Sequence, residues 1–390
     1  MCADRIEPKR WIRSPWFIWS WLLVLAVVVL QSLNYHWRFL PTTASGYFAR
    51  GRTDYLGGEY EGAIRNFTKA IERDAKDSES YIWRGEAFVK LREFGEAKKD
   101  LQKGLDLAPD YAKSHAAMAD YEAAVWNRDG AIKEFTVAIE DDPTYARCYL
   151  ERAQLYFDAG RWDDVASDLR KATGLLVEDR QTTAYLLVWL ARARSGDAAG
   201  ATAELSSVVA SKRLDVHRFW AGARFFGGET AEPAFIAEMA DDPGGDEDEL
   251  KTEAYFLAGE KRLAFGDRAG GLALLRNVVR SGLEDAYAFD RARVELSKTL
   301  VGLETMRLDD GSLAIVSVTP GGPAAAAGIE PGSRLGAIDD RPASRETFLE
   351  LLAKAEPGLT VQLQEVRADG SRRVVPLAIV LTLETSAPTK

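Results

Sequence analysis

The chain is 390 residues long, with 46% hydrophobic and 28% charged residues, a composition typical of folded domains. Acidic residues outnumber basic ones, so the formal net charge is -10 at pH 7. Binding to a nucleic-acid backbone requires clustered Lys and Arg side chains, and the sequence shows no such stripe. Length and charge therefore predict two or three packed domains and argue against a nucleic-acid partner.

The first predicted element is an apolar segment near the N-terminus. It begins WFIWSWLLVLAVVVLQSL at Trp16 and runs for eighteen residues without a charge. A helix of about 20 apolar residues crosses a hydrocarbon core of about 30 Å. We predict a single transmembrane helix over residues 16–35, after a tail of residues 1–15. The alternative interpretation of this segment is a cleaved signal peptide.

The flanking charges predict the orientation of this helix. Arg5, Lys9, Arg10 and Arg13 precede the apolar segment, whereas only Arg38 follows it closely. The side richer in Lys and Arg stays in the cytoplasm. We therefore expect a single-pass membrane protein with a cytoplasmic N-terminus and a periplasmic or extracellular bulk.

After the apolar segment the sequence repeats with a period of 34 residues. The recurring small and larger apolar positions are Ala63, Ala97, Ala131, Phe67, Leu101 and Phe135. Antiparallel helices approach closely where both present small side chains, and larger side chains fill the gap to the next pair. This spacing resembles the tetratricopeptide repeat. The fold class predicted is mainly α, with a solenoid of these repeats over residues 45–210.

The segment 211–250 carries weaker periodicity, and we predict an irregular insert that ends in the acidic run DDPGGDEDEL. This run lacks the ligand order of a calcium loop, so a solvated loop is favoured. A last repeat-like hairpin and a capping helix are predicted over residues 251–300.

Two stretches of this second half, EAYFLAGE from Glu253 and DRARVEL from Asp290, carry a further resemblance. With the repeats before them, they resemble the new lipoprotein I family of periplasmic adaptors. Members of that family dimerise and deliver substrates to a tail-specific protease, so the resemblance implies protein partners, a homodimer and a bacterial envelope location. This chain differs in having a membrane helix in place of a lipid anchor and in continuing for 90 residues more.

The stretch TPGGPAAAAGIEPG at 319–332 looks like a linker but lies between two strand-like runs, at 313–318 and 334–339. Its Pro, Ala and Gly positions resemble the hallmark of the bacterial protease type of PDZ domain, with Ser333 and Asp340 in place of the usual Asp and Gly. The resemblance implies a small α+β PDZ-like domain over residues 301–384, followed by a tail at 385–390.

A PDZ domain binds an extended peptide as an extra strand and holds its carboxylate on backbone N–H groups of a loop. The resemblance implies a peptide groove lined by Val301, Gly302, Leu303, Thr305, Phe348 and Leu352. The alternative role of Gly302 is to end the preceding helix as its C-cap.

The repeats predict a second binding surface on their concave face. The positions expected there are Arg52, Glu86, Asp120 and Gln154. The carboxylate clamp of heat-shock co-chaperones needs Lys and Asn at inner positions, where the first unit has Phe48 and Arg52, so we do not expect a co-chaperone of that kind. This face could equally form a dimer interface.

We expect no enzyme activity, no cofactor and no metal site. The histidines are His36, His115 and His217. His36 lies at the predicted membrane interface and His115 inside a repeat helix, whereas a catalytic triad needs a Ser and a carboxylate grouped around one histidine at a suitable site. Phosphate-binding Gly loops and Cys/His metal spacings are also absent from the sequence.

The sequence thus predicts a non-catalytic, membrane-anchored scaffold or adaptor in the bacterial inner membrane. It would recruit proteins, among them C-terminal tails, to an envelope protease. The main alternative is a structural assembly factor for a membrane complex, in which the PDZ-like unit is an internal brace, and a weaker one is a protease inhibitor. An adaptor needs an open PDZ groove, whereas a brace fills the groove with its own chain.

Overall fold

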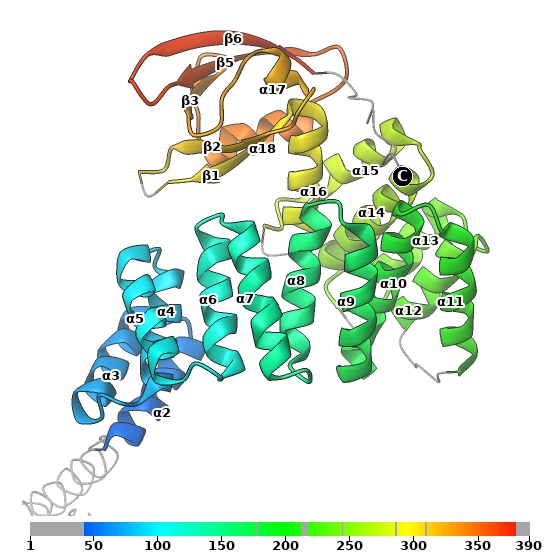
Figure 1. Ribbon diagram of the computed structural model, residues 1–390. Coiled ribbons are helices and arrows are strands. Elements are labelled where there is room, and N and C mark those ends of the chain that lie inside the picture. The colour runs from blue at the N-terminus through cyan, green and yellow to red at the C-terminus, as the bar shows by residue number, and fades with distance from the viewer. Residues whose placement is uncertain are drawn as a thin grey trace, which may run out of the picture. The chain divides into compact units, whose positions relative to one another are not determined.

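Figure 1 shows the computed structural model, which describes residues 43–176, 178–211, 217–243, 245–284, 287–308 and 310–379. The predicted transmembrane helix at 16–35 and the two predicted tails lie outside these residues. Over the described ranges, none of the helices combines the length and the hydropathy that a membrane span requires. The chain divides into two compact units, Met1–Pro109 and Asp110–Lys390.

The first unit contains two helical hairpins, drawn in blue and cyan in Figure 1. Their helices are α2 (Ala44–Leu56), α3 (Tyr60–Arg73), α4 (Ser78–Lys90) and α5 (Phe94–Leu107). The small residues of the repeat stand where paired helices meet. A Cβ atom on Gly51 would lie 2.8 Å from the ring of Phe67, and one on Gly85 would lie 2.7 Å from Leu101 Cγ. The close helix pairing expected from the 34-residue period is therefore present.

The second unit continues with hairpins of the same kind. Its first helices are α6 (Ala112–Ala124), α7 (Arg128–Asp141), α8 (Ala146–Asp158) and α9 (Trp162–Leu175). Ala131 and Phe135 are fully or almost fully buried between them. The prediction of a mainly helical repeat fold is confirmed here.

Seven further α-helices follow before the first strand, within the described residues of the second unit. They are α10 (Glu178–Arg194), α11 (Ala198–Ser211), α12 (His217–Gly227), α13 (Glu232–Ala240), α14 (Glu247–Ala264), α15 (Arg268–Ser281) and α16 (Tyr287–Leu296). Helix α16 packs against α14 and α15 and also contacts α8, which precedes it by more than 100 residues. We refer to α6 through α16 as the second-unit solenoid.

The prediction of an irregular insert over 211–250 is wrong. Helices α12 and α13 lie in this segment, because its aromatic residues pack into the same core as the neighbouring helices of the second unit. The rings of Phe225 and Phe235 stack with centroids 4.2 Å apart, and Phe219 is fully buried. The end of the acidic run forms the start of helix α14. Asp246 caps this helix, and acidic residues fill its first turn, where the helix dipole favours negative charge.

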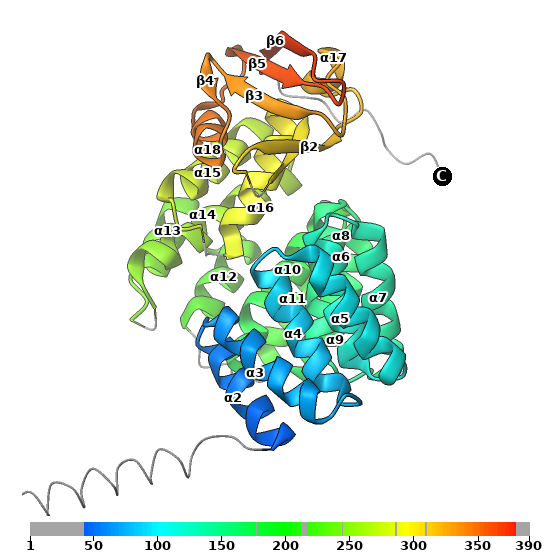
Figure 2. The same cartoon turned by 90° about the vertical axis from the view of Figure 1, so that its left-hand side faces the viewer.

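Residues 303–379 form the C-terminal module, which holds one antiparallel sheet and two helices (Figures 1 and 2). Its strands are β1 (Leu303–Arg307), β2 (Leu313–Val318), β3 (Arg334–Ile338), β4 (Arg341–Pro342), β5 (Thr360–Val366) and β6 (Arg372–Ala378). The strand order is β1-β2-β3-β5-β6, with β4 paired to β3. Strand β1 therefore forms an edge of the sheet that the described residues build.

The linker-like stretch at 319–332 belongs to this module. It contains the short helix α17 (Pro323–Ala326), whose Pro323 and Ala324 are buried. Helix α18 (Arg345–Lys354) begins at a capping box made by Ser344 and Thr347. A π-helical turn, η2 (Ser297–Val301), joins α16 to β1 with Gly302 as the only residue between turn and strand.

Candidate functional site

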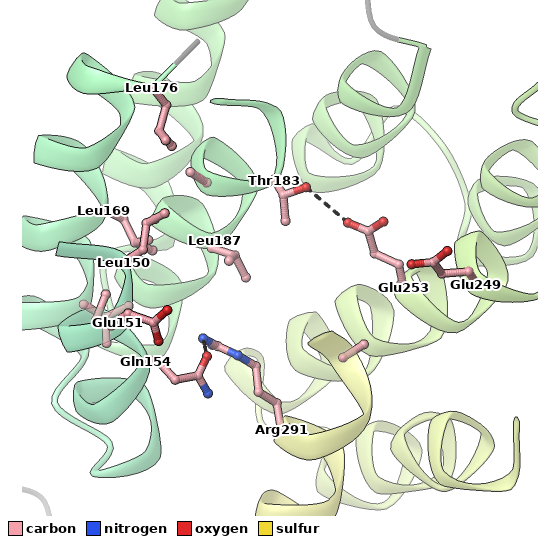
Figure 3. A pocket seen from close by; sticks show the side chains of 14 residues that line it. Leu150, Glu151, Gln154, Leu169, Leu176, Thr183, Leu187, Glu249, Glu253 and Arg291 are labelled. Atoms are coloured by element: carbon pink, nitrogen blue, oxygen red, sulfur yellow. Dashed lines mark hydrogen bonds between the residues drawn. The ribbon is translucent and has the colours of Figure 1, made fainter. Parts of the chain in front are cut away.

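The second-unit solenoid contains a cavity of about 480 Å³. Residues of α8, α9, α10, α14 and α16 line it, so we name it the interhelical pocket (Figure 3). Its volume lies within the usual range of ligand-binding cavities, about 300–1,000 Å³.

Apolar side chains at helical spacing make the floor of the interhelical pocket. They are Leu150, Ala153, Val165, Leu169, Leu176, Ala184, Leu187 and Ala288. Val165 and Leu169 are four residues apart on α9, and residues at this spacing share one face of a helix. The same helix faces that bury the solenoid core therefore extend into the pocket.

Polar side chains form two bridges across the pocket, both drawn in Figure 3. Arg291 of α16 donates a hydrogen bond to Gln154 of α8, and its guanidinium lies 4.4 Å from the ring centroid of Phe157. Thr183 of α10 donates to Glu253 of α14 at 3.3 Å. These bridges tie the early helices of the solenoid to its late ones at the site itself.

Carboxylates dominate the charge of the lining. Glu151, Glu249 and Glu253 line the pocket, against the single described cation Arg291. Glu151 also pairs with Arg147 at 3.7 Å. Because Glu249 is exposed, the acidic side of the pocket faces solvent. The pocket thus joins an apolar floor to an acidic rim.

Of the four predicted concave-face residues, Gln154 alone lines the interhelical pocket. Arg52 is exposed on α2 and Glu86 is half-buried on α4, both in the first unit. Asp120 on α6 accepts a hydrogen bond from Arg147 at 2.6 Å.

Most of the pocket lining was not predicted. Repeat spacing could have located Leu150 and Leu169, because α8 and α9 keep the 34-residue register. Thr183 and Arg291 lie on α10 and α16, where no repeat register marks a position. The contact between α8 and α16 depends on how the solenoid curves, which the sequence pattern does not contain.

The predicted peptide groove of the C-terminal module is buried in this structure. The exposed fractions are 0% for Val301, Leu303 and Leu352, 2% for Phe348 and 5% for Thr305, and Gly302 is also buried. Helix α18, which carries Phe348 and Leu352, packs against α15 and α16. The second-unit solenoid therefore covers part of α18, and the residues predicted to line the groove are not accessible in this structure.

The loop before β1 already uses hydrogen-bonding groups that a peptide would need. Gly302 donates its N–H to the carbonyl of Ser297 at 2.8 Å, with φ at +79°, so it is the C-cap of η2. The hydroxyl of Ser297 donates to the carbonyl of Leu303. A Cβ atom at Gly302 would lie 2.9 Å from Pro323 Cδ, so the loop also packs closely on α17.

A buried ion cluster joins β1 to the solenoid. The side chain of Glu304 is 3% exposed and accepts two hydrogen bonds from Arg128 of α7, at 2.8 and 2.9 Å. Lys298 lies 3.2 Å away, and Ser317 donates at 2.6 Å. Burial alone would raise the pKa of Glu304, but the hydrogen bonds from Arg128 and the charge of Lys298 outweigh it and lower the pKa to about 2.

Other contacts add to this junction. Arg276 of α15 donates to the carbonyl of Ala355 at the end of α18, and Arg345 pairs with Glu284 at 2.8 Å. The C-terminal module is therefore held to the solenoid at β1 and at both ends of α18.

A second buried carboxylate lies inside the solenoid. Glu260 of α14 is fully buried, with Arg194 at 3.7 Å, and Arg194 also lies 3.6 Å from Glu295. Burial raises the pKa of Glu260 to about 7, and the charge of Arg194 opposes that rise.

In the part of the chain that the structure describes, no three His, Cys, Asp or Glu side chains are grouped to hold a metal ion. His115 pairs with Glu134 at 2.7 Å inside the repeats.

Comparison with known proteins identifies the repeats. A family model described as tetratricopeptide repeat matches residues 78–111. Hsp70-Hsp90 organizing protein 2 of Arabidopsis thaliana is 28% identical over 94 residues, which are 24% of this chain and 16% of the relative. Serine/threonine-protein phosphatase T of Aspergillus oryzae is 29% identical over 100 residues, which are 26% of this chain and 21% of the relative. The chain thus spans about a fifth or less of these curated relatives.

Solved structures with similar folds include the crystal structure of MamA protein, with a TM-score of 0.36 and 18% identity over 49% of this chain and 94% of that one. A thermophilic tetratricopeptide repeat protein of Thermus thermophilus has a TM-score of 0.35 and 19% identity, over 46% of this chain and 98% of that one. The sequence match at 78–111 shows that this chain carries tetratricopeptide repeats, which indicate a scaffold for protein–protein interactions.

Proposed function

We propose that this tetratricopeptide repeat protein is a non-catalytic scaffold, anchored in a bacterial inner membrane, that holds a protein complex together. In this proposal the interhelical pocket takes a segment of a partner protein. The C-terminal module is a PDZ-type domain that serves as an internal brace. This is the assembly-factor alternative among the functions expected from the sequence.

The observation that carries the proposal is the contrast between the two predicted binding surfaces. The residues expected in the PDZ-type groove are at most 5% exposed. The solenoid instead offers a cavity of about 480 Å³ with the exposed Glu249 at its rim. A peptide that adds to a sheet edge needs access to that edge and to a side-chain pocket beside it, so the accessible cavity is the better candidate for a partner.

The membrane anchor and the envelope location belong to the proposal on the strength of the sequence alone. The apolar segment at 16–33 has the length of a span, and the basic residues before it favour a cytoplasmic N-terminus. The repeats and the C-terminal module would then lie in the periplasm.

A second candidate function is the adaptor that recruits substrates to an envelope protease. One observation favours it: β1 is an edge strand that follows the predicted carboxylate-binding loop. Peptide binding there would require the buried residues of the predicted groove to become accessible. The adaptor therefore predicts a second state of the module, whereas the brace does not need one.

Site-specific photo-cross-linking tests the proposal in the full-length chain in its native membrane. A photoreactive amino acid replaces Leu176, which lines the pocket, or Leu175, which is 40% exposed next to it and does not line the pocket. We expect a discrete protein adduct from position 176 and none from position 175. Equal adducts from both positions, or none from position 176, contradict the pocket as a partner site.

The brace and the adaptor are separated by loosening the C-terminal module. The change Arg128→Met removes two hydrogen bonds from Glu304 at the junction. An adaptor whose groove opens should then bind C-terminal peptides more tightly than the wild type. A brace should show no gain in peptide binding and should lose the adduct at position 176.

A further inference from the structure

Capping of α14 does not explain the acidic rim of the interhelical pocket. Asp246 alone caps this helix, accepting from the N–H groups of Asp248 and Glu249. The helix dipole favours acidic residues in the first turn, but Glu253 lies one turn further along. Glu249 and Glu253 are four residues apart on the pocket side of α14, and like charges at this spacing repel each other.

Of these two carboxylates, Glu249 gives the stronger indication of a cationic ligand. Within the described ranges, neither Lys nor Arg forms an ion pair with its side chain, which is exposed beside the leucine-lined floor. The described cation of the lining, Arg291, is already engaged by Gln154 and by the ring of Phe157. The pocket therefore combines apolar surface with negative charge directed at whatever enters it.

We infer that the interhelical pocket binds an apolar segment of a partner protein that carries Lys or Arg beside its apolar side chains. The inference rests on the proposed function and adds the chemistry of the partner. The floor around Leu150 and Leu187 takes the apolar side chains, and Glu249 and Glu253 pair with the flanking cations. An acidic segment would place its carboxylates against these two residues, and binding it through Arg291 would cost the bond to Gln154.

Two short peptides test this in the purified full-length protein, by fluorescence anisotropy. One has a Leu-rich centre with Lys at both ends, and the other carries Glu in place of every Lys. We expect the Lys peptide to bind more tightly and the preference to shrink as salt is raised, since exposed charges are screened beyond about 10 Å at 0.1 M ionic strength.

Reversing the charge of Glu249 tests whether the acidic rim causes the preference for the Lys peptide. The change Glu249→Lys should weaken the Lys peptide by about three- to tenfold and strengthen the Glu peptide, as expected for removing and inverting one exposed ion pair. Glu247→Lys is the matched control, because Glu247 is exposed in the same turn of α14 but does not line the pocket. It should change neither affinity by more than about twofold.

These outcomes distinguish a failure of this inference from a failure of the proposed scaffold function. If position 176 still gives its adduct but the Glu peptide binds as well as the Lys peptide, or Glu249→Lys acts no differently from Glu247→Lys, the inference is overturned and the scaffold proposal stands. If neither peptide binds and position 176 gives no adduct, both are overturned.

Discussion

The ion cluster around Glu304 gives the sharpest prediction, because this carboxylate is 3% exposed and has three partners. The change Arg128→Met removes the partner that donates two hydrogen bonds and leaves an uncharged, unbranched side chain. Glu304 then stays buried with Lys298 and Ser317 alone. We expect the contact between β1 and the solenoid to weaken.

The magnitude follows from the pKa of Glu304, which falls from 4.5 to about 2 on folding. That difference corresponds to about 3 kcal/mol in favour of the folded state, after the opposing effect of burial is included, since one pKa unit is worth about 1.4 kcal/mol. Removing one partner of a buried pair typically costs about 3–5 kcal/mol, because the remaining charge is left uncompensated. A loss of about 2–4 kcal/mol is therefore expected for Arg128→Met.

Hydrogen exchange followed by mass spectrometry measures this loss of stability at β1 itself. The amides of residues 303–307 should exchange at least about tenfold faster in Arg128→Met, since about 1.4 kcal/mol is a factor of ten in an opening equilibrium. Arg341→Met is the control: Arg341 also forms a two-point pair, with Glu350, but their side chains are 56% and 45% exposed. Exposed pairs contribute about 0–1 kcal/mol. If β1 exchanges equally fast in the two variants, the cluster does not hold the module.

Three further measurements test other parts of the structure. Folding raises the pKa of Glu260 from 4.5 to about 7, so its contribution to stability is fully present below about pH 4.5 and is lost as pH rises to about 7. The free energy of unfolding should fall by roughly 3 kcal/mol over this range, and Glu260→Gln should flatten the dependence. Folding shifts the pKa of Glu304 in the opposite direction, so its stabilisation is present above about pH 4.5 and is lost as pH falls toward about 2. Hydrogen exchange of the β1 amides should therefore become faster in acid. Gly302→Ala should lower thermal stability more than Gly370→Ala, by about 1–3 kcal/mol, because both have positive φ but only Gly302 has backbone and side-chain atoms near 3 Å from an added Cβ; equal losses would contradict a tight contact with α17.

The parts of the fold that could be predicted are those set by local spacing. The small residues Gly51 and Gly85 mark helix crossings at a fixed distance along the chain, so repeat hairpins follow directly from the sequence. Asp339 and Asp340 both adopt positive φ, so the turn at which Asp replaces the expected Gly still forms. Strands on either side of 319–332 are also present as expected.

The parts that could not be predicted depend on contacts between distant segments. Helices α12 and α13 form because Phe225 stacks on Phe235, a pairing that no repeat period marks. Arg128 and Glu304 are 176 residues apart and lie in elements predicted to belong to different domains. Likewise, Arg291 reaches the interhelical pocket only because α16 contacts α8. Sequence patterns identify each surface but not what covers it.

The burial of the predicted peptide groove is consistent with how the C-terminal module is attached. Gly302 alone separates η2 from β1, so the sheet continues directly from the helix that closes the solenoid. A domain that moves independently needs a flexible linker, and this junction provides none. Any opening would have to rearrange η2 and pivot at Gly302, two residues before the Glu304 cluster. π-helical turns often occur at functional sites. Arg128→Met therefore acts at the hinge itself: a variant that loosens without gaining peptide binding contains a brace, and one that gains peptide binding has the attachment of a regulated adaptor.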